Sequence, residues 1–253
     1  MNEITRHNEI VALVNNKGMV KVTELVCHFA ISPATARRDI SKLDQDCRVK
    51  KVRNGIMKVE EKKPIWAPLD ITNTDNYHEK ARIALRAAKL CHDGENIIIN
   101  CGSTAFLLGR ELCGKNISII TNYFPLASYL IENNHENVII MGGLYNKSQN
   151  IIINPIGNIA NAYGGKWMFT SGKALTPTGL YKTEILTAVS EQQMLDKTEK
   201  LVVVVDSSKI SMKVDAGMLF CPVSKIDVLI TGKQADKAVI EAIKHQGVEV
   251  ILV

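Results

Sequence analysis

The chain has 253 residues, of which 46% are hydrophobic, and its 31 Lys and Arg against 26 Asp and Glu give a formal net charge of +5. No apolar run approaches the ~20 residues that a membrane-spanning helix needs, and the polar N-terminus is unlike a signal peptide. The six cysteines form no CxxC pair, and no His/Cys/Asp spacing suggests a metal site. We therefore expect a cytoplasmic protein of one large or two ordinary domains, without a metal, a cofactor or a membrane contact.

The first 59 residues have the pattern of a winged helix-turn-helix. A helix is expected at residues 6–16, ending at Gly18. Thr23 is expected to cap a second helix through Phe29, and Ser32 to cap a third helix with Pro33 at its first position. Residues 49–53 and 56–59 then form a basic strand pair that turns at Asn54-Gly55, a strong hairpin signal.

The excess positive charge lies in this segment. Residues 1–58 contain 11 Lys and Arg against 6 Asp and Glu, so the other 195 residues are neutral. A solvated charged helix face is the alternative interpretation, but cap, turn, basic helix and basic wing occur here in register. The second helix of such a motif enters the DNA major groove. We therefore expect this segment to bind DNA through Ser32, Ala34, Thr35, Arg37, Arg38, Lys42, Lys50, Lys51 and Arg53.

Residues 60–76 are predicted to be a linker, because two prolines and a charge run favour extended structure. Residues 77–253 alternate helices and strands, which predicts an α/β domain. The strands are expected at 97–99, 117–120, 138–141, 151–153, 167–169, 201–205, 228–230 and 248–253, and the helices at 79–91, 105–113, 126–133, 185–195 and 237–246. Most strands are continuous aliphatic runs, as in parallel sheets that are covered on both faces.

Several predicted strands end in small or polar residues, where open α/β sheets bind ligands. Gly102-Ser103-Thr104 stands at a strand-to-helix junction and has the composition of an anion cradle, with Lys173 and Lys209 as counter-charges. Ser and Thr are also common N-caps, so one such loop alone favours an ordinary cap. Because several polar strand ends converge, the sequence favours a phosphate or polyol site. No acid/base pair is evident, which argues against an enzyme.

These motifs resemble the DeoR-type bacterial transcriptional regulators over nearly the whole chain. The resemblance is carried by residues 20–25 and 31–40, Leu43, Glu79-Lys80, Asp93-Gly94, 102–104, 121–122, 142–143 and 206–209. It implies a C-terminal sugar-phosphate sensor domain similar in fold to ribose-5-phosphate isomerase. Ser103, Thr104 and Lys209 match the loop and the lysine that hold the sugar phosphate there.

From the strand ends and this resemblance together, we expect effector contacts from Asn100, Cys101, Gly102, Ser103, Thr104, Asn122, Gly142, Gly143, Lys173, Lys182, Ser207 and Lys209. One departure stands out, because family members often carry Asp-Gly where this chain has Lys173-Ala174. The change removes an acidic group that would meet a sugar hydroxyl, and it favours an anionic or oxygen-rich ligand.

A closer resemblance, to family members that repress L-ascorbate utilisation, is carried by residues 32–42, 50–55, 100–110, 145–149, 167–173 and 179–183. It implies operator DNA as partner, L-ascorbate 6-phosphate or another phosphorylated sugar acid as effector, and a homo-oligomer, either a dimer or a tetramer. The residues alone reach only a phosphorylated polyol or sugar acid. They also leave open an activator in place of a repressor, and an isomerase-like enzyme with an accessory DNA-binding domain.

Overall fold

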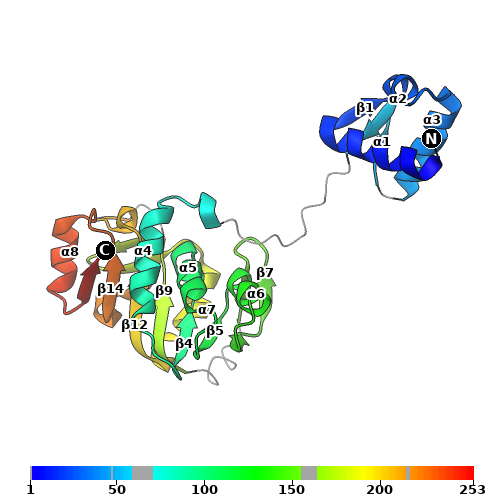
Figure 1. Cartoon of the computed structure of the whole chain (residues 1–253). Helices are drawn as coiled ribbons and strands as arrows, with labels where there is room; N and C mark the ends of the chain where they lie inside the picture. Colours follow the sequence, from blue (N-terminus) through cyan, green and yellow to red (C-terminus); the bar gives the residue numbers. More distant parts are fainter. Residues whose placement is uncertain (1, 47, 59–70, 155–163, 215–216) are drawn as a thin grey trace. The chain divides into compact units, whose positions relative to one another are not determined.

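The computed structural model describes residues 2–46, 48–58, 71–154, 164–214 and 217–253. The chain divides into an N-terminal unit, Met1–Ala67, and a C-terminal unit, Pro68–Val253 (Figure 1). Most of the predicted linker lies outside the described residues. Its last part, however, contains a 3-10 helix, Ile71–Asn73, whose Ile71 is buried in the core of the C-terminal unit. In the described part of the chain, no helix is both long and apolar enough to cross a membrane.

The N-terminal unit is a winged helix-turn-helix, as predicted. Its elements are α1 (Glu3–Lys17), β1 (Met19–Lys21), α2 (Val22–Phe29), α3 (Pro33–Gln45), β2 (Lys50–Val52) and β3 (Gly55–Met57). The strands form an antiparallel sheet in the order β1-β3-β2. One apolar core joins all three helices to this sheet, and its fully buried members include Ile10, Leu25, Ile40, Leu43 and Ile56.

The predicted cap of α3 is confirmed, and the predicted cap of α2 is wrong. Ser32 precedes α3, its Oγ accepts a hydrogen bond from the Thr35 N–H at 3.1 Å, and Pro33 is the first helical residue. Helix α2 instead begins at Val22, so Thr23 lies inside it. The carboxylate of Glu24, the third helical residue, accepts the N–H of the N-cap residue Lys21 at 2.8 Å, as the N3 carboxylate does in a capping box.

The hairpin of the wing is confirmed, but its turn is one residue earlier than predicted. Val52 pairs with Gly55, so the turn residues are Arg53 and Asn54, and Asn54 has a φ of 68°. Gly55 belongs to β3 and also pairs with Lys21 of β1, a strand that the sequence did not predict. A Cβ at Gly55 would lie 2.4 Å from the Val20 carbonyl oxygen, so this glycine serves the close approach of β1. Residue 59 lies outside the described residues.

The C-terminal unit is built on a seven-stranded parallel sheet. Its strands are β4 (Asn96–Ile99), β5 (Ser118–Thr121), β6 (Asn137–Ile140), β9 (Gly165–Thr170), β12 (Thr198–Val204), β14 (Val228–Thr231) and β15 (Glu249–Leu252), in the order β15-β14-β12-β9-β4-β5-β6. The chain fills the sheet outward in one direction from β4 and then in the other from β9. The β4/β9 junction is therefore the topological switch point, where open α/β sheets bind ligands.

Helices cover both faces of this sheet, which explains the continuous aliphatic strands (Figure 1). Ile97 and Ile99 of β4 pack into one core with α4 (Tyr77–Ala88), α5 (Ser103–Leu112) and α6 (Phe124–Glu132). Ile98 points to the other core, which contains residues of α7 (Ile185–Gln192) and α8 (Lys237–Lys244). The predicted α/β class with a parallel sheet is confirmed.

Two antiparallel additions were not predicted. One is a three-stranded sheet in the order β10-β11-β13, from β10 (Ala174–Thr176), β11 (Gly179–Lys182) and β13 (Met218–Pro222). The other pairs β7 (Leu144–Asn146) with β8 (Ile151–Ile153). The prediction that residues 151–153 form a strand is therefore right, but this strand is not part of the main sheet. A short connection joins β7 to β8, and such a connection produces an antiparallel pair.

Candidate effector cavity and nucleic-acid interface

A cavity of about 310 Å³ lies at the switch point, where β4, β9 and β12 end. It contains seven of the twelve predicted effector residues, namely Cys101, Gly102, Ser103, Thr104, Lys173, Lys182 and Lys209. These residues come from chain segments more than a hundred positions apart, and the crossover of the sheet brings them together. The remaining wall residues are Lys80, Gln149, Ser171, Gly172, Thr183, Glu184, Thr187 and Asp206.

The loop after β4 is arranged as an anion cradle. Gly102, with a φ of 136°, is the N-cap of α5, and Ser103 and Thr104 are its first two residues. Neither hydroxyl therefore serves as the N-cap, so ordinary capping does not account for this Ser-Thr pair. The first-turn N–H groups of a helix have no acceptor within the helix and carry the positive end of its dipole. This end of α5 can bind an anion.

Lys209 lies on the wall contributed by the end of β12. It follows Asp206, whose Oδ1 accepts hydrogen bonds from the N–H and Oγ–H of Ser208 and from Asn76 Nδ2, the last at 2.9 Å. Asp206 Oδ2 lies 3.8 Å from Lys80 Nζ. The Asp206 carboxylate therefore stabilises the turn that contains Lys209 and neutralises Lys80.

A buried ion pair joins Lys182, which lines the cavity, to Glu191 of α7. Lys182 Nζ donates to Thr170 Oγ1 at 2.8 Å and to the Glu191 carboxylate of α7. The other Glu191 oxygen accepts the Cys101 N–H at 3.3 Å and Asn122 Nδ2 at 3.2 Å. Glu191 therefore connects α7 to the ends of β4, β5 and β11 and fixes the floor of the cavity.

Replacing Glu191 by glutamine is expected to destabilise the C-terminal unit by about 1.5–3 kcal/mol, the usual contribution of a hydrogen bond to a charged group. The amide leaves the Lys182 ammonium without a counter-charge, and its NH₂ faces donors. Denaturant unfolding of the full chain measures the change. Glu132→Gln is the control, since Glu132 is exposed and accepts only the Ser128 hydroxyl in the described part of the chain. Equal stability of Glu191→Gln and wild type would contradict the structural role of the pair.

The charge of the cavity favours an anion. Four lysines line it against the two carboxylates of Glu184 and Asp206. Lys182 is neutralised by Glu191 and Lys80 by Asp206, whereas Lys173 and Lys209 have no carboxylate partner among the described residues. Burial, and next the charge of Glu191, raise the pKa of the Cys101 thiol far above its usual value, so this cysteine adds no negative charge.

The other five predicted effector residues do not line the cavity. Asn100 and Asn122 are buried beneath it, where their Nδ2 atoms donate to Thr170 and Glu191. Gly142 and Gly143 stand apart from it, and a Cβ at Gly143 would meet the Ile153 carbonyl oxygen of β8 at 2.3 Å. Ser207 is turned toward α4, because its N–H and hydroxyl both donate to Glu79, at 2.6 and 3.0 Å.

The contribution of α7 to the cavity was not predicted from the sequence. Thr187 and Glu191 are one helical turn apart, and both are buried, at 4% and 1% exposure. Two buried polar residues at i and i+4 on a helix indicate a polar environment on that face. That spacing was the available signal. Lys80, one turn into α4, offered no comparable local signal.

Helix α3, the second helix of the helix-turn-helix, presents most of the predicted DNA-contacting residues to solvent. Ser32, Ala34, Arg37 and Arg38 are exposed, and Thr35 is half-buried because its N–H and hydroxyl bond to Ser32. A groove of about 690 Å³ lies between α2, α3 and the wing. It is lined by Lys21, Val22, Thr23, Val26, Cys27, Pro33, Arg37, Ile40, Lys51, Val52, Asn54 and Gly55. It brings Arg37 of α3 and Lys51 of the wing together on one surface.

Two predicted DNA contacts already have partners within the protein. Lys42 Nζ lies 2.5 Å from a carboxylate oxygen of Glu3, and Lys51 Nζ donates to Ser41 Oγ at 3.0 Å. Both lysines are exposed, so DNA would compete with these partners. Lys50 and Arg53 are exposed on the wing, and Arg53 lies at its tip.

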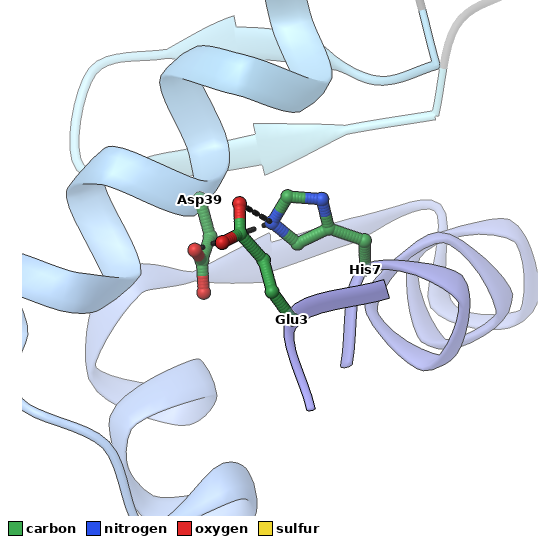
Figure 2. Close-up of side chains that lie close together, drawn as sticks. All are labelled: Glu3, His7 and Asp39. Carbon is green, nitrogen blue, oxygen red and sulfur yellow. Dashed lines mark ion pairs between the residues drawn. The ribbon is translucent and has the colours of Figure 1, made fainter. Parts of the chain in front are cut away.

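Glu3, His7 and Asp39 converge between α1 and α3 (Figure 2). His7 Nε2 lies 3.2 Å from Asp39 Oδ1 and 3.9 Å from Glu3 Oε1. These residue types can bind metal ions, but Arg6 Nε bonds to Asp39 at 2.7 Å and Lys42 bonds to Glu3. Both carboxylates are therefore neutralised by the protein itself. The cluster therefore serves to hold α1 against α3 through ion pairs and hydrogen bonds.

Comparisons with known proteins match the chain to two family models, to full-length relatives and to solved structures. Residues 6–62 match the model of the DeoR-like helix-turn-helix domain, and residues 75–233 match that of the DeoR C terminal sensor domain. The HTH-type transcriptional regulators UlaR of Escherichia coli K12 and Shigella boydii serotype 18 are each 52% identical over 253 residues, which is the full length of both chains. Among solved structures, ribose 5-phosphate isomerase A from Methanocaldococcus jannaschii aligns with a TM-score of 0.40 and 21% identity, covering 53% of this chain and 55% of the isomerase.

Proposed function

Because the chain belongs to the DeoR family of helix-turn-helix transcriptional regulators, we propose that it represses a sugar or ascorbate utilisation operon and that a phosphorylated effector releases it from operator DNA. The observation that carries the effector part is the cavity at the switch point. Its cradle at the N-terminus of α5 lies beside two lysines that have no carboxylate partner among the described residues. The isomerase alternative is not retained, because the full-length relatives are transcriptional regulators.

We propose L-ascorbate 6-phosphate as the effector. The volume of about 310 Å³ lies at the lower end of the usual range for small-molecule sites, which suits a phosphorylated six-carbon compound. The phosphate would bind Ser103, Thr104 and Lys209, and the exposed Lys173 would face an acidic oxygen of the sugar acid. The likeness to UlaR supports ascorbate over other sugar acids.

Operator binding would be made by Arg37 and Arg38 in the major groove and by Lys50, Lys51 and Arg53 on the flanking backbone. Helix-turn-helix modules bind two half-sites as dimers, so we propose a cytoplasmic homo-oligomer held together by the C-terminal unit. The effector would weaken operator binding by changing the equilibrium between two arrangements of the oligomer. Such couplings typically amount to about 1–3 kcal/mol.

Ser103→Ala and Lys209→Ala are expected to give a repressor that the effector no longer releases. Each removes one charge-assisted hydrogen bond to the phosphate, which costs about 1.5–3 kcal/mol, or roughly 10- to 100-fold in effector affinity. Operator affinity without effector should stay near that of wild type, because neither residue belongs to the DNA-binding unit. Gel shifts on the upstream region of an ascorbate operon, titrated with L-ascorbate 6-phosphate and with ascorbate, measure both properties.

Lys233→Ala is the matched control, since it removes an exposed lysine of the same unit that does not line the cavity. It should respond like wild type. Two results would show that the cradle does not bind the phosphate. One is release of the protein from DNA by unphosphorylated ascorbate at the same concentration as by the 6-phosphate. The other is a normal response of Lys209→Ala to the 6-phosphate.

A further inference from the structure

Helix α7 contributes a hydroxyl to the cavity that has no partner among the described residues. Thr187 lines the cavity, is 4% exposed, and its Oγ1 makes no hydrogen bond to any residue that the structure describes. Buried polar atoms are nearly always paired, so each exception needs an explanation. The Thr231 hydroxyl also has no partner in the described part of the chain, but Thr231 does not line the cavity. Thr187 thus combines an unpaired hydroxyl with access to a ligand.

The lysines that line the cavity differ in how they are paired. Lys182 is neutralised by Glu191, bonds to Thr170 and lies 4.7 Å from the centre of the Phe220 ring. An ammonium group held in this way is not a free counter-charge for a phosphate. Lys209, which lines the same cavity as the N-terminus of α5, has no carboxylate partner among the described residues. The cavity therefore combines groups that can bind an anion with the uncharged hydroxyl of Thr187.

We propose that Thr187 binds an uncharged oxygen of the effector, a hydroxyl or a carbonyl, in the portion of the molecule that is not the phosphate. Glu191 acts through its neighbours as a positioning residue, because it fixes the turn of α7 that follows Thr187 and the floor beneath it. The hydroxyl selects phosphorylated polyols and sugar acids over inorganic phosphate, which has no such portion. This inference rests on the proposed function of the cavity as an effector site.

Calorimetric titration of the full chain with two probes tests the role of Thr187. Thr187→Val keeps the branched shape and removes the hydroxyl. It is expected to bind L-ascorbate 6-phosphate roughly tenfold more weakly, as for one lost hydrogen bond, and inorganic phosphate as well as wild type does. Thr187→Ser restores the hydroxyl and should recover most of the affinity. Ser103→Ala should weaken binding of both probes.

Thermal melting without ligand separates binding from a structural role. Thr187→Val removes an unpaired buried hydroxyl, so its melting temperature should equal or exceed that of wild type. Thr121→Val is the matched control, because the Thr121 hydroxyl donates to the Ile99 carbonyl at 2.7 Å and accepts the Tyr123 N–H at 3.0 Å. That variant should melt at a lower temperature.

The outcomes separate this inference from the proposed function. If Thr187→Val binds both probes like wild type, or loses both equally, the hydroxyl does not select the effector. A lowered melting temperature with unchanged binding would assign Thr187 a structural role instead. A wild-type protein that binds neither probe would contradict the proposed function, and the assignment of Thr187 with it.

Discussion

Replacing Asp39 by alanine is expected to unfold the N-terminal unit and abolish DNA binding, while the C-terminal unit stays folded. The Asp39 side chain is fully buried and accepts hydrogen bonds from Arg6 Nε at 2.7 Å and Nη2 at 3.3 Å. Without it, the Arg6 guanidinium, on a side chain that is only 10% exposed, loses its carboxylate partner. Breaking a buried pair in this way costs about 3–5 kcal/mol, comparable to the whole stability of a ~60-residue domain.

Unfolding of the full chain, followed together with operator binding, measures this effect. The unfolding transition of the N-terminal unit should disappear in Asp39→Ala, and the transition of the C-terminal unit should remain. Asp46→Ala is the control, because Asp46 is exposed at the end of α3, and it should change stability by no more than about 0.5 kcal/mol. Retained cooperative unfolding of the N-terminal unit in Asp39→Ala would refute the role of the pair.

The same carboxylate makes the stability of this unit dependent on pH. Burial raises the pKa of Asp39, but the hydrogen bonds from Arg6 and His7 outweigh it and hold the pKa below its usual value of 3.8. A group whose pKa is lowered by folding stabilises the protein fully above its unfolded-state pKa, and this contribution is lost as the pH falls through the folded-state pKa. The stability difference between wild type and Asp39→Asn should therefore be constant near neutral pH and shrink below about pH 4.

Arg37→Ala and Arg38→Ala are expected to remove specific operator binding and leave both units folded. Both side chains are exposed on α3, and Arg37 lines the groove that reaches the wing, so their loss leaves no cavity in the core. A bidentate contact between arginine and guanine contributes about 1–3 kcal/mol of base discrimination, which is roughly 5- to 150-fold. A residue that contacts only phosphate would instead lose affinity about equally on all sequences.

Competition gel shifts with operator and unrelated DNA distinguish these two roles. Lys17→Ala is the charge-matched control, because it removes one positive charge from the end of α1, where Lys17 pairs with Glu24 at 3.5 Å. It should reduce binding to all sequences slightly or leave it unchanged. Operator affinity that is unchanged in both Arg37→Ala and Arg38→Ala would show that α3 is not the recognition helix.

Several residues that look equivalent in the sequence have different partners in the structure. Ser103 and Ser207 both follow parallel strands, but only Ser103 lines the cavity, since Ser207 bonds to Glu79 of α4. Lys42 and Arg38 lie one turn apart on α3, yet Lys42 is paired with Glu3 of another helix. Neighbouring sequence cannot distinguish such residues, because the partner is supplied by a distant segment.

Features that depend on a few adjacent residues could be predicted from the sequence. Ser32-Pro33 indicated the start of α3, and Gly102-Ser103-Thr104 indicated the junction from strand to helix α5 at the cavity. The aliphatic runs indicated strands that are covered on both faces. Caps, turns and periodicity are local, so they can be inferred without a fold. Only the structure shows the β10-β11-β13 sheet, the Arg6–Asp39 ion pair and the position of Thr187 in the cavity wall. Each depends on packing between segments far apart in the chain, where the free energy of burial and pairing is set by tertiary contacts and not by local propensity.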